Sequence, residues 1–280
     1  MDIHAQALTE WLCGRRVAEV LRAPPLEPLE TRILLCLALG FSRSHLITRS
    51  EHALSAVQAE KLAVLIARRQ RGEPIAYITG EREFYGLPFH TTPAVLIPRP
   101  ETELLVDLAL DALPQGARVL DMGTGSGAIA VAIAHMRPDC KVTALDASTD
   151  ALEVARHNAS LHAPGVRLLH SNWYAALQGE QFDLIAANPP YIASGDRHLS
   201  EGDLRFEPID ALTDQGDGLE ALRTIIAGAR HHLHEGGRLL VEHGYDQAGA
   251  VRELMHQHGL HGACSWRDLA GIERISGAAR

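Results

Sequence analysis

The sequence has few cysteines, no long apolar run and no visible secretion signal. Its four cysteines, Cys13, Cys36, Cys140 and Cys264, form no C-x-x-C pair, which argues against a structural zinc site and fits single thiols in a reducing compartment. The longest apolar stretch, residues 33–39, is far shorter than the roughly 20 residues that cross a bilayer. The first residues, MDIHAQALTEW, lack the charged head and apolar core of a leader. We therefore expect a cytoplasmic protein with no membrane partner.

The chain also lacks a basic surplus, and its histidines are scattered. Its 280 residues carry a net charge of −9, divided into +3 over residues 1–72 and −12 over residues 73–280. Binding to duplex DNA draws on several phosphate neutralisations, so we expect no stable nucleic-acid binding. The only histidine cluster, His231, His232 and His234, lies in a helical pattern without a supporting ligand set. We interpret it as a solvated helix end and expect no metal, although a metal site is the alternative.

The pattern of apolar residues and breakers divides the chain into three parts. Residues 1–72 predict a small helical bundle, with helices over 3–21, 30–39 and 50–71 that stop at Gly40 and Gly72. In residues 73–100, glycine and proline punctuate short β-rich pieces, which predicts a linker carrying a hairpin around Gly86.

From residue 101 to residue 280, strand-like and helix-like segments alternate. Strands are expected at 118–121, 141–146, 166–169, 182–187 and 238–242, and helices at 128–136, 149–161, 218–234 and 247–258. Alternation of this kind predicts an α/β domain with a mainly parallel sheet and helices on both faces.

A glycine turn follows the first of these strands, in RVLDMGTGSGAIAVAIA. Gly123, Gly125 and Gly127 permit a tight turn that exposes backbone N–H groups at a helix N-terminus. Asp146 lies nineteen residues after Gly127, at the end of the next strand, where a carboxylate accepts hydrogen bonds from ribose hydroxyls. The pattern predicts a nucleoside-containing cofactor, and glycines alone also fit a dinucleotide.

Asp121 distinguishes between these cofactors because it precedes the turn directly. Its negative charge opposes a pyrophosphate and suits S-adenosyl-L-methionine, which carries an ammonium and a sulfonium. The alternative is that Asp121 only orders the loop through its backbone. After the third strand, Asn172 and Trp173 are placed to meet the adenine by hydrogen bond and stacking, although Trp173 fits a core position equally well.

The fourth strand ends in Asn188, Pro189, Pro190 and Tyr191. Ligands of open α/β sheets bind beyond the carboxyl ends of the strands. The two prolines hold the chain extended, and so the Asn188 side-chain oxygen and the Pro189 carbonyl form a rigid pair of acceptors beside the Tyr191 ring. Such a pair suits an –NH2 on a planar group, whose N–H bonds it would grip more strongly as the nitrogen becomes tetrahedral. The alternative is a turn that merely ends a strand.

With both motifs in place, the chain resembles the protein-(glutamine-N5) methyltransferases that modify peptide chain release factors. The resemblance covers nearly the whole chain and includes PIAYITGEREFYGLPF, VLIPRPETELLV, VLDMGTGSGAIA, ANPPYI, RFEP and LLVEHG. It implies a helical domain, a hairpin linker and a seven-stranded Rossmann-like S-adenosylmethionine domain. It further implies transfer of a methyl group to the glutamine of a Gly-Gly-Gln loop, with S-adenosyl-L-homocysteine as the product.

The resemblance also implies the roles of individual residues. Asn188, Pro189 and Tyr191 would be catalytic, and together with Pro190 they would hold the substrate glutamine. The cofactor would be bound by Asp121, Gly123, Thr124, Gly125, Ser126, Gly127, Asp146, Asn172, Trp173 and Asn188. Asn172 departs from the family, where Asp is common, which weakens the expected adenine contact.

Other segments of the resemblance have simpler readings. Glu101 and Glu103, which follow Arg99, fit a helix first turn, where acidic side chains favour the dipole. Arg205 and Glu207 lie in an irregular stretch, where a loop-ordering salt bridge is as reasonable as substrate contact. We expect a monomer whose helical domain recognises release factors.

Three other functions remain open at this point. An adenine-N6 methyltransferase of DNA or RNA shares the Asn-Pro-Pro-Tyr motif, and a nicotinamide-dependent oxidoreductase shares the glycine spacing. A non-catalytic docking module is the third.

Overall fold

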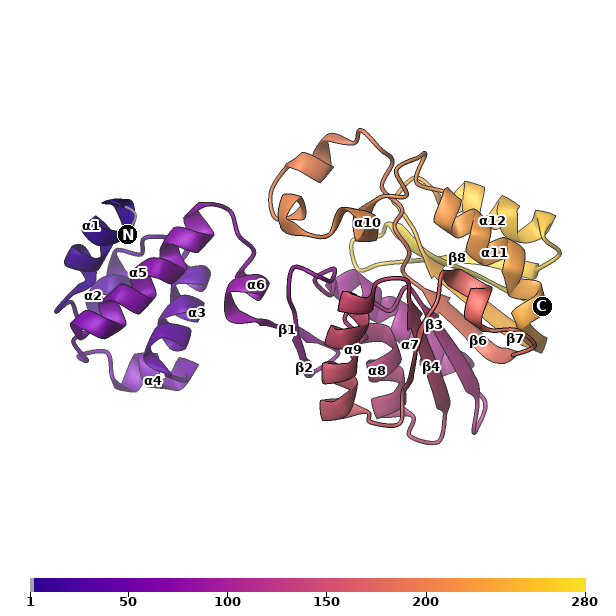
Figure 1. Ribbon diagram of the computed structural model, residues 1–280, viewed down its shortest axis with the longest axis horizontal. Coiled ribbons are helices and arrows are strands. Elements are labelled where there is room, and N and C mark those ends of the chain that lie inside the picture. The colour runs from indigo at the N-terminus through magenta and orange to yellow at the C-terminus, as the bar shows by residue number, and fades with distance from the viewer. Residues whose placement is uncertain (1–2) are drawn as a thin grey trace. The chain divides into compact units, whose positions relative to one another are not determined.

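The computed structural model describes residues 3–280, and the chain divides into two compact units, Met1–Gly80 and Glu81–Arg280 (Figure 1). Each unit buries its own apolar core. The boundary lies at residues 80 and 81, so the ribbon that the sequence placed in a linker folds with the larger unit.

The smaller unit is entirely helical where the structure describes it. Its helices are α1 (Ile3–Leu12), α2 (Val17–Arg22), α3 (Pro28–Leu39), α4 (Arg43–Thr48), α5 (Ala56–Gln70) and α6 (Ile75–Thr79). The single helix expected over 3–21 is wrong, because Gly14 takes a φ of 77° and a new helix begins after Arg16, whose backbone N–H donates to Glu19 Oε2 at 2.8 Å. The helix expected from residue 50 begins later, where Ser55 caps α5 by accepting from Gln58 N. The short helix α4 was not expected.

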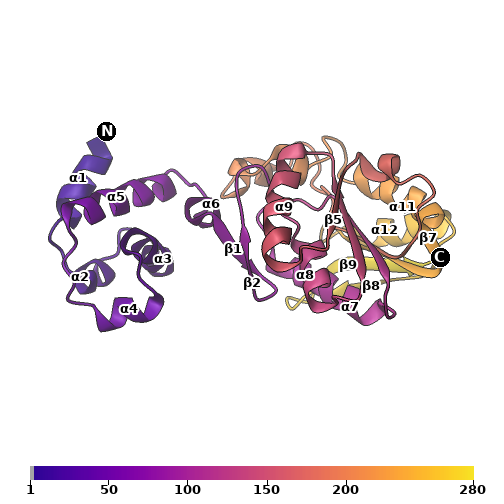
Figure 2. The ribbon, with the colours of Figure 1, turned by 60° about the horizontal axis from the view of Figure 1, so that its bottom comes forward.

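The larger unit begins with the predicted hairpin, and its presence is confirmed. Strands β1 (Glu81–Phe84) and β2 (Leu87–His90) are joined by Tyr85 and Gly86, whose φ angles of 53° and 77° suit a two-residue hairpin turn. Phe84 and Phe89 are buried in the core of this unit, and β2 contacts α9 (Thr149–His162; Figure 2). The hairpin therefore stands beside the sheet as part of its scaffold.

A mixed seven-stranded sheet forms the centre of the larger unit, in the order β5-β4-β3-β6-β7-β9-β8. The strands are β3 (Arg118–Met122), β4 (Lys141–Asp146), β5 (Arg167–His170), β6 (Phe182–Ala187), β7 (Leu233–Glu242), β8 (His261–Arg267) and β9 (Glu273–Ala279). Neighbouring strands are parallel from β5 to β7, and β9 is antiparallel to both β7 and β8. The predicted α/β fold with seven strands is thus confirmed, although the pattern of the sequence did not locate β8 and β9.

Helices cover both faces of the sheet, as Figures 1 and 2 show. On one face, α7 (Glu103–Ala112), α8 (Ala128–Met136) and α9 pack on Val119 and Leu184; on the other, α11 (Glu220–His232) and α12 (Ala248–Gln257) pack on Leu120 and Ile185. Successive strand residues alternate between the two cores because the side-chain period of a strand is two.

The order of strands creates a crevice at the carboxyl edge of the sheet. The chain runs outward from β3 to β4 and β5, and then returns to β6 on the other side of β3. Ligands of open α/β sheets bind at such a switch point. Between β6 and α11, an insertion adds η3 (Arg197–Ser200), η4 (Leu204–Phe206) and α10 (Ile209–Leu212).

Over the described residues, no helix is both long and apolar enough to span a bilayer. In the same part of the chain, no group of three or more histidine, cysteine or acidic side chains is arranged to hold a metal ion. His231 and His232 form the last turn of α11, and the ring of His232 stacks on Tyr174.

Candidate active site at the carboxyl edge of the sheet

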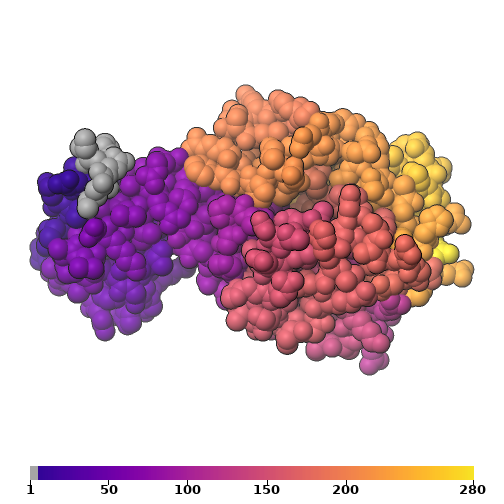
Figure 3. Space-filling model, viewed as in Figure 1, coloured from indigo at the N-terminus to yellow at the C-terminus, as the bar shows by residue number. Residues whose placement is uncertain are grey.

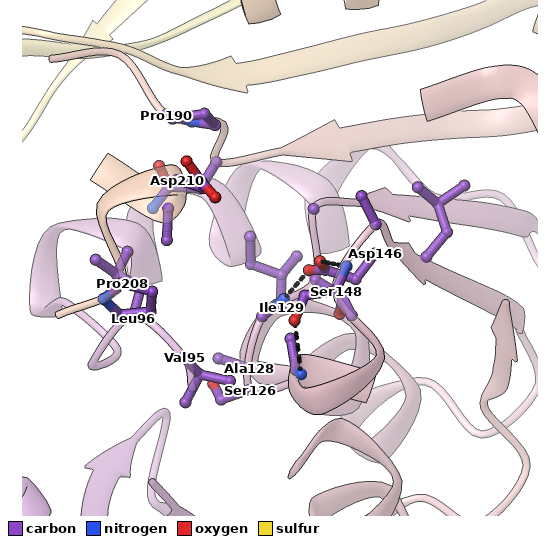
Figure 4. Close-up of a pocket in the computed structure, with 18 of the residues that line it drawn as sticks. Val95, Leu96, Ser126, Ala128, Ile129, Asp146, Ser148, Pro190, Pro208 and Asp210 are labelled. Carbon is purple, nitrogen blue, oxygen red and sulfur yellow. Dashed lines mark hydrogen bonds between the residues drawn. The ribbon is translucent and has the colours of Figure 1, made fainter. Parts of the chain in front are cut away.

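A cavity of about 420 Å³ lies at the carboxyl ends of β3, β4, β5 and β6, within the range of small-molecule sites. Figure 4 shows the glycine turn, the end of β4, the segment before α7 and the insertion converging on it. Of the sequence-predicted residues, the cavity is lined by Gly123, Thr124, Gly125, Ser126, Asp146, Asn172, Trp173, Asn188 and Pro190.

Asp146 is tied to the glycine turn by its carboxylate. Oδ2 accepts from Gly125 N at 2.9 Å, and Oδ1 accepts from Ser148 N at 2.9 Å. A carboxylate has about four lone-pair sites, so Asp146 retains acceptors for further hydroxyl donors. Asp146 is also only partly buried, which leaves it in reach of a ligand in the cavity.

Gly127 lies behind the cavity, at the N-terminus of α8. Its φ is 85°, and a Cβ there would lie 3.4 Å from the Cα of Ala155 in α9. This glycine therefore lets two helices approach each other, a packing role that orders the turn.

Trp173 forms a flat wall of the cavity. Its φ of 47° is unusual for a residue with a side chain, and Ser171 Oγ donates to its carbonyl at 2.7 Å. A Cβ at Gly123 would lie 3.8 Å from the Trp173 ring. Trp173 also packs against the apolar core that α11 covers, so it both lines the cavity and belongs to that core.

Asp121 is fully buried under α8, on the face of β3 that it shares with Val119. Its Oδ2 accepts from Thr124 Oγ1 at 2.6 Å and from Ala130 N at 3.2 Å, so the Asp121 side chain orders the turn. Within residues 3–280, Oδ1 is a buried oxygen without a hydrogen-bond partner. Burial raises the pKa of Asp121 to about 7.

Asn188 lines the cavity, and its amide nitrogen is turned to Thr102. Its Nδ2 donates to Thr102 Oγ1 at 3.1 Å, and in the described chain Oδ1 makes no hydrogen bond. Pro190 lines the cavity beside it, whereas Pro189 is buried; among the described residues, no backbone N–H outside the helices and strands donates to the Pro189 carbonyl. The predicted pair of acceptors is thus not engaged elsewhere.

Tyr191 lies behind this pair and is not a wall of the cavity. Its ring packs on the core below α11, and its hydroxyl donates to Glu242 Oε1 at 3.3 Å. Its carbonyl accepts from Gln247 Nε2 at 3.0 Å. Burial, and next the charge of Glu242, raise the pKa of the Tyr191 hydroxyl.

Sequence reasoning missed Glu242 and Thr102 as parts of the site. Thr102 Oγ1 donates to Glu242 Oε2 at 2.7 Å, and both residues are buried. Burial raises the pKa of Glu242 to about 7, against the opposing effect of the bonds from Thr102 and Tyr191. The sequence did contain a signal for Glu242, because it follows the apolar run 239–241 just as Asp146 ends the apolar strand β4.

An ion pair between a partly exposed Arg99 and a buried Glu207 holds the insertion at the cavity. Glu207, with a fully buried side chain, accepts from Arg99 Nη2 and, at 3.0 Å, from Ile97 N. This is the kind of loop-ordering salt bridge expected for the stretch, with Arg99 as the partner. Burial raises the pKa of Glu207. The neighbouring Pro208 and Asp210 line the cavity, and Figure 3 shows the insertion, in orange, at the surface.

These residues fit S-adenosylmethionine better than a dinucleotide. Asp121 is buried beneath the turn with one oxygen unpartnered among the described residues, and in its ionised form it would oppose a pyrophosphate there. A partly exposed carboxylate and a flat indole wall suit a ribose and an adenine.

Two family models match the chain. Residues 14–80 match the PrmC N-terminal domain, and residues 100–202 match the methyltransferase small domain. The second match spans β3 to β6 and the first part of the insertion.

The chain is also similar to curated proteins over most of its length. It is 57% identical over 269 residues to the release factor glutamine methyltransferase of Burkholderia pseudomallei, covering 93% of this chain and 94% of that protein. It is 43% identical over 268 residues to the release factor glutamine methyltransferase of Escherichia coli, covering 95% and 96%.

Solved structures share the fold. A methyltransferase from Pyrococcus furiosus aligns with a TM-score of 0.54 at 22% identity, covering 76% of this chain and 95% of that chain. The 16S rRNA N2 G1207 methyltransferase of T. thermophilus, in complex with AdoMet and guanosine, aligns with a TM-score of 0.54 at 18% identity, covering 71% and 49%.

Asp121→Asn is expected to become more stable relative to the wild type as the pH rises. Asp121 has a folded pKa raised from 3.8 to about 7, so its contribution to stability is complete below pH 3.8 and is lost as the pH rises through about 7. Asparagine cannot ionise, and therefore the difference in free energy of unfolding should shift by about 3 kcal/mol in favour of the variant between pH 5 and pH 8. Urea denaturation of both proteins at the two pH values measures it; a constant difference would contradict the burial of a titrating group.

Asp146→Ala is expected to raise the dissociation constant for S-adenosylmethionine at least ~10-fold. The change removes the acceptors for a ribose and leaves Gly125 N–H and Ser148 N–H without their partner. Isothermal titration calorimetry measures the affinity. Asp150→Ala, an exposed aspartate on α9, is the matched control and should bind like the wild type; equal affinities for the two variants would remove Asp146 from the site.

Proposed function

Because this chain belongs to the family of release factor glutamine methyltransferases, we propose that it methylates a glutamine of peptide chain release factors. It is an S-adenosyl-L-methionine-dependent enzyme, and the atom modified is the side-chain amide nitrogen (N5) of the glutamine in the Gly-Gly-Gln motif. The observation that carries the proposal is Asn188, which lines the cavity with its Nδ2 bonded to Thr102 and its Oδ1 without a hydrogen bond among the described residues. The relatives favour this substrate over the adenine-N6 alternative.

The chemical difficulty of this reaction lies in the substrate nitrogen. An amide nitrogen delocalises its lone pair into the carbonyl and is a poor nucleophile. When the methyl group arrives, the nitrogen becomes tetrahedral and its N–H bonds become more acidic. Acceptors on those N–H bonds are therefore stronger partners in the transition state than in the ground state, which is the condition for catalysis.

Asn188 and Pro189 supply these acceptors. Asn188 Oδ1 and the Pro189 carbonyl would each take one N–H of the glutamine, and the two prolines keep the acceptors from relaxing away. Pro190 would contact the carboxamide of the substrate. The hydrogen bond from Tyr191 to Glu242 would fix the position of the segment that carries both acceptors. The nitrogen gains the methyl group and loses one proton to solvent.

The other side of the cavity would hold the cofactor, which supplies a methyl group on a cationic sulfur. Asp146 would accept from the ribose, Trp173 would face the adenine, and Asn172 would lie at its edge. The floor of this part of the cavity is the glycine turn, residues 123–126. Asp121 fixes the turn through its bond from Thr124, and Gly127 does so through the close packing of α8 on α9. The ion pair of Arg99 and Glu207 would keep the insertion over the reacting groups and limit the access of water.

We also propose that residues 1–72 recognise the release factor and that the enzyme acts in the cytoplasm as a monomer. The support is the separateness of this helical unit and its net charge of +3, beside a larger part of −12. An enzyme that modifies one loop of a large protein needs a second contact for selectivity.

Incubation with labelled S-adenosylmethionine and an unmodified release factor tests the function. The label should appear on the glutamine of the Gly-Gly-Gln motif, located by peptide mapping, and a factor with Gln→Ala at that position should stay unlabelled. Label on nucleic acid, on another residue or on nothing would overturn the proposal.

Asn188→Ala should lower kcat by about 100-fold or more, the usual effect of losing one preorganised transition-state partner. Binding of S-adenosylmethionine should remain measurable, because the glycine turn and Asp146 are untouched. Steady-state kinetics and calorimetry give the two quantities. An unchanged kcat would exclude Asn188 from the chemistry.

Deleting residues 1–80, the whole smaller unit, should raise the KM for the intact release factor much more than the dissociation constant for S-adenosylmethionine. The remaining unit keeps its own core and the complete cavity. Equal effects on both quantities would contradict a docking role.

A further inference from the structure

The orientation of the Asn188 carboxamide decides whether the site offers an acceptor or a donor. Rotating this group by half a turn exchanges Oδ1 and Nδ2 at almost no steric cost. In one orientation the cavity receives an oxygen, which suits a substrate –NH2. In the other orientation it receives a second –NH2, which cannot pair with the substrate.

Thr102 is the neighbour that distinguishes these two orientations. Its hydroxyl lies 3.1 Å from Asn188 Nδ2 and 2.7 Å from Glu242 Oε2. A hydroxyl has one proton to donate and accepts through its lone pairs. Thr102 therefore donates to only one of these two neighbours and must accept from the other.

Glu242 determines which way the Thr102 proton points. Above its pKa of about 7 the Glu242 carboxylate is ionised and only accepts, and its oxygens then accept from Thr102 and from the Tyr191 hydroxyl at 3.3 Å. The Thr102 hydroxyl is thereby committed to Glu242, and its lone pairs face Asn188. Only the amide –NH2 of Asn188 can satisfy them, which leaves Oδ1 for the cavity.

The fold brings these groups together from three distant segments. Glu242 ends β7, Asn188 follows β6, and the two strands are parallel neighbours in which Ala187 pairs with Val241. Thr102 precedes α7 and is separated from Glu242 by 140 positions. Thr102 is 4% exposed and Glu242 2% exposed, so water does not compete for these bonds.

We infer that Glu242 and Thr102 are positioning residues that set the Asn188 carboxamide with its oxygen toward the substrate amide. A buried acid is otherwise an expensive component of this core, and Arg274 and Glu101 are the other charged groups that act on it. The inference rests on the proposed function, because it gives the carboxamide of Asn188 a substrate –NH2 to receive.

Glu242→Gln tests this directly. A glutamine amide can donate to Thr102, which frees the Thr102 proton for Asn188 Oδ1 and allows the wrong orientation. The kcat for methyl transfer to the release factor should fall at least ~10-fold. The KM for S-adenosylmethionine should stay within about two-fold and the Tm should not fall, since glutamine has nearly the same shape and removes a buried charge.

A second pair of variants keeps the test independent of Glu242. Thr102→Val removes the hydroxyl and preserves the shape, so its kcat should fall as in Glu242→Gln. Thr102→Ser restores the hydroxyl, and its kcat should exceed that of Thr102→Val by at least ~10-fold. Glu235→Gln, at an exposed position on the same strand β7, is the control and should match the wild type.

The outcomes separate this inference from the proposed function. A wild-type enzyme that leaves the release factor unlabelled overturns the proposed function. A wild type that labels it, with Glu242→Gln keeping its kcat within two-fold, overturns the inference alone. So does a Glu242→Gln variant in which kcat and Tm fall while the KM for S-adenosylmethionine rises, since that pattern marks a merely structural residue.

Discussion

The hydrogen bond from Asn188 Nδ2 to Thr102 Oγ1 is the interaction on which the account of this site depends. With Nδ2 held there, Oδ1 is the atom of the carboxamide that remains for the cavity, where the proposed reaction needs an acceptor. The two prolines that follow Asn188 restrict its backbone, and the bond to Thr102 restricts the tip of its side chain. The sheet provides the framework, since the carboxyl ends of β6 and β7 lie side by side.

Three buried carboxylates surround the cavity, and each has a raised pKa because of its burial. Asp121 orders the glycine turn, Glu207 fastens the insertion to Arg99, and Glu242 accepts from Thr102 and Tyr191. Buried charge costs stability, so these groups are better explained by the rigidity they give to a polar site than by the stability of the fold. The apolar cores on both faces of the sheet, rich in leucine, isoleucine and alanine, stabilise the unit that contains them.

Much of the fold was predictable because local patterns and tertiary structure agree. The segments 128–136, 141–146 and 182–187 were predicted with the bounds that the structure gives, since each is an apolar run that a turn residue or a polar residue ends. Strand β9 was missed because Ser276, Gly277, Ala278 and Ala279 have little strand propensity; its pairing with β7 and β8 decides its conformation. The break after α1 was missed because the apolar spacing continues across Gly14, whose left-handed backbone ends the helix.

The site was predictable where one segment carries the information. The glycine turn, Asp146 and Asn188 are at the cavity because each follows a strand. Asp121 lies under α8 because strand parity turns it to the face of Val119. Thr102 lies 86 positions from Asn188 and 140 positions from Glu242 along the chain, and no local sequence pattern predicts contacts over such separations.

A crystal structure with S-adenosylhomocysteine and a Gly-Gly-Gln peptide tests the central claim most directly: Asn188 Oδ1 and the Pro189 carbonyl should each lie within about 3.2 Å of the glutamine amide nitrogen. A glutamine nitrogen that faces Asn188 Nδ2, or that contacts neither oxygen, would contradict it.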